Sequence, residues 1–245
     1  MLINVFCNEQ NERNSWIFLF YFIACFHIQP LFLTVMKGNY DTVAPFYDWL
    51  SRFVFRDAIL QAHSFLVDAI PASSSVLIAG GGTGFILEEI LRKHAIGLEI
   101  TYVDISKKMI ALSKKRNIGG NKVLFINKSI HDAVFLNQFD VVITPFFLDN
   151  FTNSTAKTVF AKIDSSLASG GLWLFADFQL SEINNVWQKI LLQCMYFFFR
   201  LLCGIEASHL PDTASFFEKY KYQQNSKQTF FRNFIYASIH VKPDI

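Results

Sequence analysis

Four glycines stand among the five residues from Gly80 to Gly84, directly after the apolar run Val76–Ala79 and before a helical pattern. Each glycine weakens regular structure by about 0.5–1 kcal/mol relative to alanine, so this cluster indicates that the backbone has to approach something closely. Backbone N–H groups between a buried strand and a helix can face a ligand there. The first chemistry that the sequence predicts is therefore ligand binding by this loop.

Two familiar phosphate-binding patterns do not fit the stretch. In the dinucleotide pattern G-x-G-x-x-G, the register from Gly80 puts Phe85 in place of the third glycine. The G-x-x-x-x-G-K-[ST] pattern fails as well, because Phe85 and Ile86 follow Gly84. Further along the chain, Asp104 ends the next predicted strand, where a carboxylate can accept hydrogen bonds from both ribose hydroxyls of an adenosine. The predicted ligand is an adenosine compound that needs no phosphate anchor.

Apolar runs and helical patterns alternate from residue 40 onward. The predicted strands are Val76–Ala79, Leu98–Asp104, Val123–Asn127, Val141–Thr144 and Leu172–Ala176, with two more strands around a turn at Asn225 and Ser226. The predicted helices are two within Tyr40–Ile70, one from near Thr83 to about His94, one after the N-cap Ser106, and then Ser154–Leu167, Asn184–Leu202 and Ala214–Tyr220. This order predicts an α/β, Rossmann-like fold: a seven-stranded, mostly parallel sheet with helices on both faces and an antiparallel C-terminal strand.

The composition disfavours several classes of function. The 245 residues include 22 basic and 20 acidic ones, mixed along the chain, and no basic block that would follow a phosphate backbone. No nucleic-acid partner is therefore predicted. The 4 cysteines lack C-x-x-C spacing and the 6 histidines are scattered, so we expect a reducing, cytoplasmic compartment and no metal site.

The segment Trp16–Val35 is nearly long enough and apolar enough to span a bilayer. A signal peptide is disfavoured, because acidic residues precede the segment and no small-residue cleavage site follows it. Three readings stay open: a membrane anchor, an apolar helix packed on the domain, or an upstream extension with initiation at Met36. We therefore treat 1–35 as an apolar extension and keep membrane association as the alternative to a purely cytoplasmic location.

Three stretches, VLIAGGGTG, YVDISKKMI and FDVVITPFF, resemble in their order and spacing the class I S-adenosylmethionine-dependent methyltransferases. The likeness covers about Tyr40 to Val241, and the combination of motifs is specific although each is weak alone. The stretch YDTVAPFYD, Tyr40 to Asp48, further resembles the branch that includes ubiquinone and menaquinone methyltransferases. The resemblance implies S-adenosylmethionine as cofactor and a methyltransferase domain over 36–245, with 184–219 as a helical cap insertion.

The resemblance also implies a role for each matching residue in binding the cofactor. The implied contacts are Ala79, Gly80, Gly81, Gly82 and Gly84 around the methionine part, Asp104 at the ribose, Ile105 at the adenine, Ser129 and Ile130 near the adenine amino group, and Thr144 beside the sulfonium. Many relatives carry an acidic residue where this chain has Ile78, and that carboxylate helps to position the methionine end. Its absence weakens binding or is offset by main-chain and water contacts.

Two other classes of function stay open beside methyl transfer. The first is a non-catalytic S-adenosylmethionine-binding protein, which Ile78 motivates. The second is a nicotinamide-dependent oxidoreductase of the same fold class, against which the missing third glycine argues.

Methyl transfer from a sulfonium is an in-line displacement, so the protein mainly supplies positioning and desolvation. The 28 phenylalanines and the apolar helix Asn184–Leu202 favour a small, apolar acceptor. That helix is either a core or cap helix or a membrane-surface element, which would give a peripheral membrane contact. A general base is needed only if the acceptor must lose a proton. The catalytic candidates, each with a purely structural role as the alternative, are Tyr47, His131, Asp149 and His209.

Overall fold

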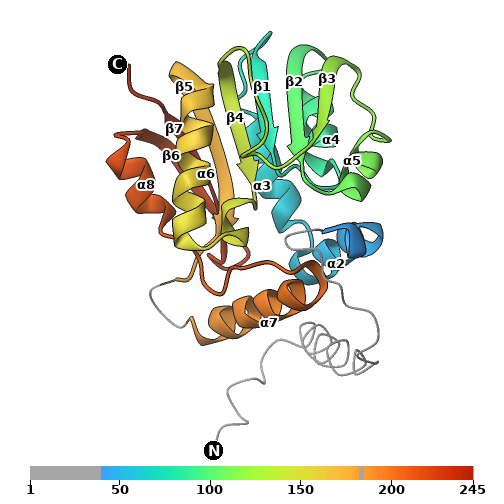
Figure 1. The fold of residues 1–245 in the computed structure, drawn as a ribbon, viewed down its shortest axis with the longest axis vertical. Helices are drawn as coiled ribbons and strands as arrows, with labels where there is room; N and C mark the ends of the chain where they lie inside the picture. Colours follow the sequence, from blue (N-terminus) through green and yellow to red (C-terminus); the bar gives the residue numbers. More distant parts are fainter. Residues whose placement is uncertain (1–39, 182–184, 245) are drawn as a thin grey trace, which may run out of the picture.

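The computed structural model describes residues 40–181 and 185–244, so the predictions for 1–35 lie outside the described residues. The strands are β1 (Ser75–Ala79), β2 (Ile96–Asp104), β3 (Gly120–Asn127), β4 (Phe139–Pro145), β5 (Leu167–Phe178), β6 (Gln223–Phe230) and β7 (Ile235–Val241). They form one sheet in the order β3-β2-β1-β4-β5-β7-β6 (Figure 1). β1 to β5 are parallel, and β7 lies antiparallel between β5 and β6. The predicted fold class is confirmed.

Helices cover both faces of this sheet (Figure 1). They are η1 (Tyr40–Thr42), α2 (Ala44–Phe55), α3 (Ala58–Val67), α4 (Phe85–Lys93), α5 (Lys107–Ser113), η2 (Leu148–Asn150), α6 (Asn153–Ser166), α7 (Val186–Cys203) and α8 (Thr213–Lys219). Side-chain caps fix where several of them begin. Ser106 caps α5 as predicted, because its Oγ accepts a hydrogen bond from the Met109 N–H at 3.1 Å.

Side chains of the central strands alternate between two hydrophobic cores, one on each face of the sheet. In β1, Val76 and Ile78 enter the core that contains α3 and α4, whereas Leu77 and Ala79 enter the core that contains α6 and α8. All four side chains are fully buried. A strand that is buried on both faces reads as a continuous apolar run, which explains why the central strands were predictable from short apolar stretches.

The C-terminal hairpin turns later than the sequence predicts. Asn225 and Ser226 lie within β6, where the register opposite β7 shifts. The turn is instead made by Phe231–Asn233, three residues with positive φ. Polar residues favour a bulge as well as a turn, and the buried pair Ile235 and Ala237 fixes the register of β7 against β5.

Among the described helices, α7 is the one that is long and apolar enough to cross a membrane by length and composition alone. Its inner side chains, Leu191, Leu192 and Tyr196, are buried against the domain. A helix that packs in this way also fits the reading as a core or cap helix. Its outer side exposes a stripe of large apolar side chains: Val186, Ile190, Phe197 and Leu201.

The predicted cap insertion 184–219 contains two helices with different places in the fold. α7 runs below the carboxyl ends of the strands and contacts η1 (Figure 1). α8 packs on α6 and buries Phe216 and Phe217 in the core on that face. Of this range, α7 is therefore the helix that can cover a site at the strand ends.

Two buried histidines, His63 and His240, make the fold sensitive to acid. Burial lowers the pKa of His63 to about 4, and burial together with Lys227 lowers the pKa of His240 to about 4. In an unfolded chain a histidine has a pKa near 6.5, so between about pH 6.5 and pH 4 the unfolded state binds more protons. The stability due to the neutral side chains is complete above this window and is lost as the pH falls through it.

We predict that His63→Leu flattens the pH dependence of stability. Neither ring nitrogen of His63 has a hydrogen-bond partner among the described residues. Leucine leaves no group to protonate, so the loss of unfolding free energy between about pH 7 and about pH 5 should shrink by about 1–2 kcal/mol, measured by urea unfolding. His209→Leu, at an exposed histidine, is the matched control. Equal pH dependence in wild type and His63→Leu would contradict the assignment.

Candidate active site

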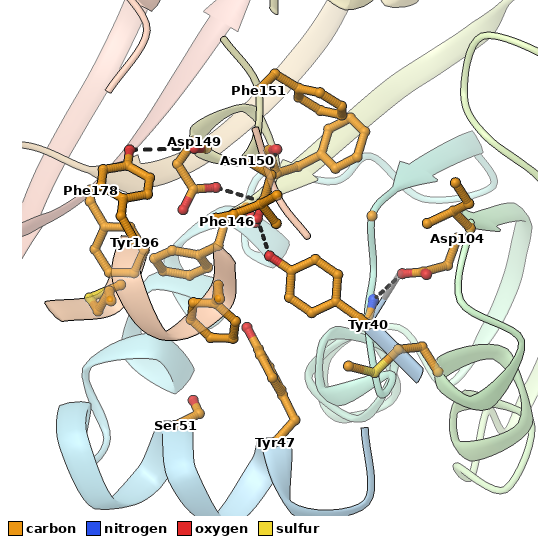
Figure 2. Close-up of a pocket in the computed structure, with 18 of the residues that line it drawn as sticks. Tyr40, Tyr47, Ser51, Asp104, Phe146, Asp149, Asn150, Phe151, Phe178 and Tyr196 are labelled. Atoms are coloured by element: carbon orange, nitrogen blue, oxygen red, sulfur yellow. Dashed lines mark hydrogen bonds between the residues drawn. The ribbon is translucent and has the colours of Figure 1, made fainter. Parts of the chain in front are cut away.

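A cavity of about 550 Å³ lies beyond the carboxyl ends of β1, β2 and β4. β1 pairs with β2 on one side and β4 on the other, so the strand order reverses at this point, where ligands bind in open α/β sheets. Figure 2 shows Asp104 at one side of the cavity, Phe178 and Tyr196 at the other, and Tyr40 between them. Its walls come from residues 80–84 (the glycine loop), the ends of β2 and β3, the segment after β4, and the helices α2, α5 and α7.

The glycines of the loop are needed for different steric reasons. A Cβ at Gly80 would lie 2.1 Å from the ring of Phe147, and a Cβ at Gly84 would lie 2.9 Å from the backbone of Ser113 in α5. At Gly82 no atom lies within 4 Å of the Cβ position, and the residue lines the cavity with φ +63°. Gly80 and Gly84 thus let protein parts pack closely, whereas Gly82 leaves open space beside the backbone for a ligand.

Asp104 joins the glycine loop to the end of β2. Its Oδ2 accepts a hydrogen bond from the Gly82 N–H at 3.0 Å, and its Oδ1 accepts one from the Ser106 N–H at 2.8 Å. On the same strand, the hydroxyl of Tyr102 donates to the Gly82 carbonyl at 3.0 Å. Both the loop and the carboxylate line the cavity. The two parts that the sequence predicts as one nucleoside site are therefore adjacent and directly bonded.

Burial raises the pKa of Asp104 to about 6. The N–H groups of Ser106 and Gly82 oppose this rise by stabilising the carboxylate, and nearby Asp41 adds to it. A carboxylate accepts hydrogen bonds more strongly than a carboxylic acid, so Asp104 is the stronger acceptor in its ionised form, which predominates above about pH 6.

The stretch Tyr40–Asp48 contains two kinds of residue that form or support the cavity. Tyr40 and Tyr47 line it, and their rings lie 6.4 Å apart, edge to face. The aspartate after each tyrosine holds a neighbouring element instead. Asp41 accepts hydrogen bonds from the Ser106 hydroxyl and the Lys108 N–H at the start of α5, and Asp48 accepts one from the Thr83 hydroxyl in the glycine loop.

Arg116 is a site-supporting residue that the sequence analysis missed. Its Nε donates to the Thr83 carbonyl at 3.0 Å, and its guanidinium forms ion pairs with Asp48 and Glu88. The same group lies over the ring of Phe85. Arg116 thus ties the loop to α2 and α4. No motif marks this role, because the partners are 28–68 residues away in sequence.

The far side of the cavity is apolar and aromatic. Phe146 follows β4, Phe178 ends β5, and their rings lie 5.2 Å apart. The remaining apolar wall consists of Leu50, Val54, Phe55 and Ile59 from α2 and α3 and of Leu191, Leu192, Met195, Phe198 and Phe199 from α7. This end suits an apolar molecule, whereas the glycine-loop end offers hydrogen bonds.

The structure brings most of the predicted cofactor contacts together. The predicted residues that line the cavity are Gly80, Gly82, Asp104, Ile105, Ser129 and Ile130; those that are not part of its lining are Ala79, Gly81, Gly84 and Thr144. Ala79 is fully buried in the core beside α6, and Gly81 and Gly84 pack against Tyr102 and Ser113. These roles in cofactor binding stay predictions at the level of single residues.

The placement of Thr144 differs from the prediction that it lies beside the sulfonium. It is fully buried, and its Oγ1 accepts a hydrogen bond from the indole N–H of Trp173 at 2.9 Å. Side chains alternate along β4, so Thr144 faces the α6 side while Ile143 faces the α3 side. Phe146 and Phe147, just beyond the strand, line the cavity instead.

Three of the four catalytic candidates, Tyr47, His131 and Asp149, line the cavity, whereas His209 is exposed and is not part of the lining. Burial raises the pKa of Tyr47 well above its usual range, with Asp149 adding to the effect. Within residues 40–181 and 185–244, no group of three or more His, Cys, Asp or Glu side chains could hold a metal ion.

A family described as a methyltransferase domain matches residues 76–171, about two fifths of the chain. This range holds the glycine loop, Asp104, Ser129 and Asp149. No curated protein matches the sequence.

Many solved structures share the fold. The 1,6-didemethyltoxoflavin-N1-methyltransferase of Burkholderia thailandensis, solved with 1,6-didemethyltoxoflavin and S-adenosylhomocysteine, is 17% identical over 83% of this chain and 86% of its own, with a TM-score of 0.60. The N-methyltransferase NodS of Bradyrhizobium japonicum, with S-adenosylhomocysteine, is 12% identical over 77% and 87%, with a TM-score of 0.55. An O-methyltransferase family 2 protein of Planctomyces limnophilus, with apigenin, is 14% identical over 78% of this chain and 61% of its own, with a TM-score of 0.58.

The family match thus supports a methyltransferase domain over residues 76–171, and the solved structures confirm the predicted Rossmann-like fold; the predicted domain bounds 36–245 stay a prediction. The prediction of an enzyme that uses S-adenosylmethionine agrees with the two relatives that hold S-adenosylhomocysteine, the product that this cofactor leaves.

We predict that Gly84→Ala destabilises the fold more than Gly82→Ala. Both positions have positive φ, but a Cβ at Gly84 also meets the Ser113 backbone, which cannot move aside as a flexible side chain would. Urea unfolding should show a loss of about 2–4 kcal/mol for Gly84→Ala and about 1 kcal/mol for Gly82→Ala. Equal losses would mean that the contact between the loop and α5 is not tight.

Proposed function

We propose that this protein, whose residues 76–171 form a methyltransferase domain, transfers a methyl group from S-adenosylmethionine to a small apolar acceptor. The proposal rests on the hydrogen bond from the Gly82 N–H to Asp104, which lies at one end of the cavity. The other end of the same cavity is apolar and aromatic. One cavity thus offers a polar end for a nucleoside and an apolar end for a second molecule. That division is what a two-substrate transfer between them requires.

The residues at the polar end fit S-adenosylmethionine. Asp104 presents a carboxylate for the two ribose hydroxyls, and Gly82 leaves open space for the methionine part. Ile105, about half exposed, and Ile130 offer apolar surface for the adenine. When bound, this cofactor supplies a methyl group on a sulfonium, which is already activated for displacement.

The chain's own contribution to the reaction is alignment and exclusion of water. α7 packs along the cavity and buries Leu191, Leu192 and Tyr196 there. In an in-line displacement, holding the acceptor atom behind the methyl carbon lowers the entropic part of the barrier. Apolar walls also remove water that would compete with the acceptor. An apolar acceptor gains from both effects because it loses little hydration on entry.

Ile78 cannot bind the methionine end of the cofactor as the acidic residue of many relatives does. It is fully buried in the α3-side core and is not part of the cavity lining. The methionine end must then be held by main-chain groups of the loop and by water. A cofactor-binding protein without catalysis is the second candidate function that this observation favours. Transfer of a radiolabelled methyl group to any component of a cell extract would exclude it.

We also propose that the protein belongs to the branch of methyltransferases that includes the ubiquinone and menaquinone enzymes, which its stretch Tyr40–Asp48 resembles. Tyr40 and Tyr47 line the cavity. Asp41 and Asp48 form hydrogen bonds to α5 and to the glycine loop, so both residues of each Tyr-Asp pair contribute to the site. A bulky isoprenoid-type acceptor is consistent with the long apolar wall.

A cytoplasmic protein with peripheral membrane contact fits the outer side of α7. Four large apolar side chains are exposed there, and the helix contains two basic residues, Lys189 and Arg200, and no acidic one. An apolar stripe flanked by positive charge favours the surface of an anionic bilayer. Such contact would bring the inner side of α7, and the cavity beneath it, close to lipid-dissolved acceptors.

We predict that wild-type protein binds S-adenosylmethionine in calorimetry and that Asp104→Ala weakens binding at least about tenfold, because two hydrogen bonds to a charged acceptor are lost. Asp132→Ala, at an exposed carboxylate outside the cavity lining, is the matched control and should bind as wild type does. Absence of any heat with wild-type protein at high ligand concentration would refute the proposed cofactor.

We predict that the double variant Ile190→Gln and Phe197→Gln reduces co-sedimentation with vesicles that contain phosphatidylglycerol, because it removes apolar area from the exposed stripe. The comparison is made in the full chain and in a chain that begins at Met36. Reduced binding in both supports contact through α7. Binding that depends on residues 1–35 alone would assign the contact to the extension.

A further inference from the structure

Two neighbouring carboxyl groups lie at the inner end of the cavity: Asp149 in η2, which lines it, and Asp177 near the end of β5, which lies behind the lining. The Asp149 N–H donates to Asp177 Oδ2 at 3.2 Å, and Asp177 Oδ1 accepts the Phe178 N–H at 2.8 Å. The side-chain amide of Asn150 donates to Asp149 Oδ1 at 2.8 Å (Figure 2). Asp149 and Asp177 are 9% and 3% exposed, and Asp149 lines the cavity while Asp177 lies behind it.

No cation compensates this pair within residues 40–181 and 185–244. The ion pairs found there involve other acidic residues. Desolvation raises the pKa of Asp149 to about 7, and desolvation together with the charge of Asp149 raises the pKa of Asp177 well above its usual range. Two negative charges this close in an apolar site are costly, so Asp177 keeps its proton when Asp149 ionises.

The tyrosines and the cysteine that lie around Asp149 do not change charge near neutral pH. Burial raises the pKa of Tyr40 in η1 and of Tyr196 in α7 well above the usual range, as it does for Tyr47 in α2. It also raises the pKa of Cys203, at the end of α7, to about 12. Asp104 titrates lower and belongs to the cofactor end. Among these groups, the carboxyl pair is the one whose charge changes near pH 7; the cavity lining also contains Lys128, His131 and Glu206.

Asn150 connects the pair to the tyrosine that separates the two ends of the cavity. The hydroxyl of Tyr40 donates to Asn150 Oδ1, and the amide of Asn150 also donates to the Phe146 and Phe147 carbonyls at 3.2 and 3.1 Å. This network fixes the orientation of the Asp149 carboxyl group at the junction of the polar and apolar parts. A carboxyl group in an otherwise aromatic wall selects a ligand that brings a hydrogen-bond donor to that point.

We propose that Asp149 accepts the O–H or N–H group of the methyl acceptor and takes up its proton, with Asp177 as the positioning residue that keeps one proton in the pair. The acceptor class is then an apolar aromatic molecule with a phenol or amine at the reacting position. This inference rests on the proposed methyl transfer and names the substrate class of the same site.

The acceptor oxygen or nitrogen attacks the methyl carbon with a lone pair and forms the new O–C or N–C bond. The electron pair of the broken C–S bond stays on sulfur, which becomes a neutral thioether, so S-adenosylhomocysteine is the second product. The proton of the acceptor passes to an Asp149 carboxylate oxygen and later to water.

The test uses three ring probes that differ in one group: naphthol, naphthylamine and naphthalene. Each is titrated into the full-length protein with saturating S-adenosylhomocysteine. Naphthol and naphthylamine should bind up to about tenfold tighter at about pH 8 than at about pH 6, because only ionised Asp149 is a strong acceptor. Naphthalene should show no such change. Asp149→Asn should bind naphthol and naphthylamine without pH dependence, and Asp132→Asn is the matched control.

A second variant separates the roles of the two carboxyl groups. Asp177 keeps its proton when Asp149 ionises, so Asp177→Asn replaces one neutral group by another and should leave the pH dependence and its midpoint close to those of wild type. Unchanged affinity for S-adenosylhomocysteine shows that each variant is folded. Wild-type binding of naphthol that does not depend on pH, or the same dependence in Asp149→Asn, overturns the inference alone. Failure of wild type to bind S-adenosylhomocysteine overturns the proposed function and this inference with it.

Discussion

The site depends on one buried carboxylate, that of Asp104, which accepts an N–H from the glycine loop and another from the start of α5. These two bonds join the carboxyl ends of β1 and β2 and hold open backbone toward the cavity. Other polar groups reinforce the joint from outside: Asp41 binds the start of α5, and Arg116 binds the loop carbonyl together with Asp48. The loop is therefore fixed from several sides before any ligand arrives, which reduces the ordering cost of binding.

Three carboxyl groups, Asp104 and Asp149 in the cavity lining and Asp177 behind it, are almost completely buried without an ion-pair partner among the described residues. Leaving negative charge in an apolar site is costly unless hydrogen bonds or a ligand compensate it. Under the proposed function, the compensation is divided. Sugar hydroxyls would satisfy Asp104, the hydrogen-bond donor of the methyl acceptor would satisfy Asp149, and both negative charges would favour a positive sulfonium in the cavity.

The two ends of the cavity differ in whether their residues lie within the range that matches the methyltransferase domain. Residues 76–171, which match the methyltransferase domain, contain the glycine loop, Asp104 and Asp149. The apolar helices α2 and α7 lie outside that range and supply much of the opposite wall. Solved structures with only 12–17% identity keep the sheet and its helices. The polar end of the cavity thus lies within the matched domain, whereas much of the apolar wall comes from helices outside it.

Local signals in the sequence determined the alternation of strands and helices, the glycine loop, Asp104 at a strand end and the N-cap Ser106, because each depends on neighbours in the chain. Tertiary structure alone decided the rest. Thr144 faces Trp173 because of the phase of β4 in the sheet, and the last hairpin turns at Phe231–Asn233 because burial of β7 fixes its register. Arg116 reaches the loop, and Asp149 meets Asp177, across 28 residues or more. Such contacts leave no periodic trace, because only chain folding brings distant side chains within a few ångströms.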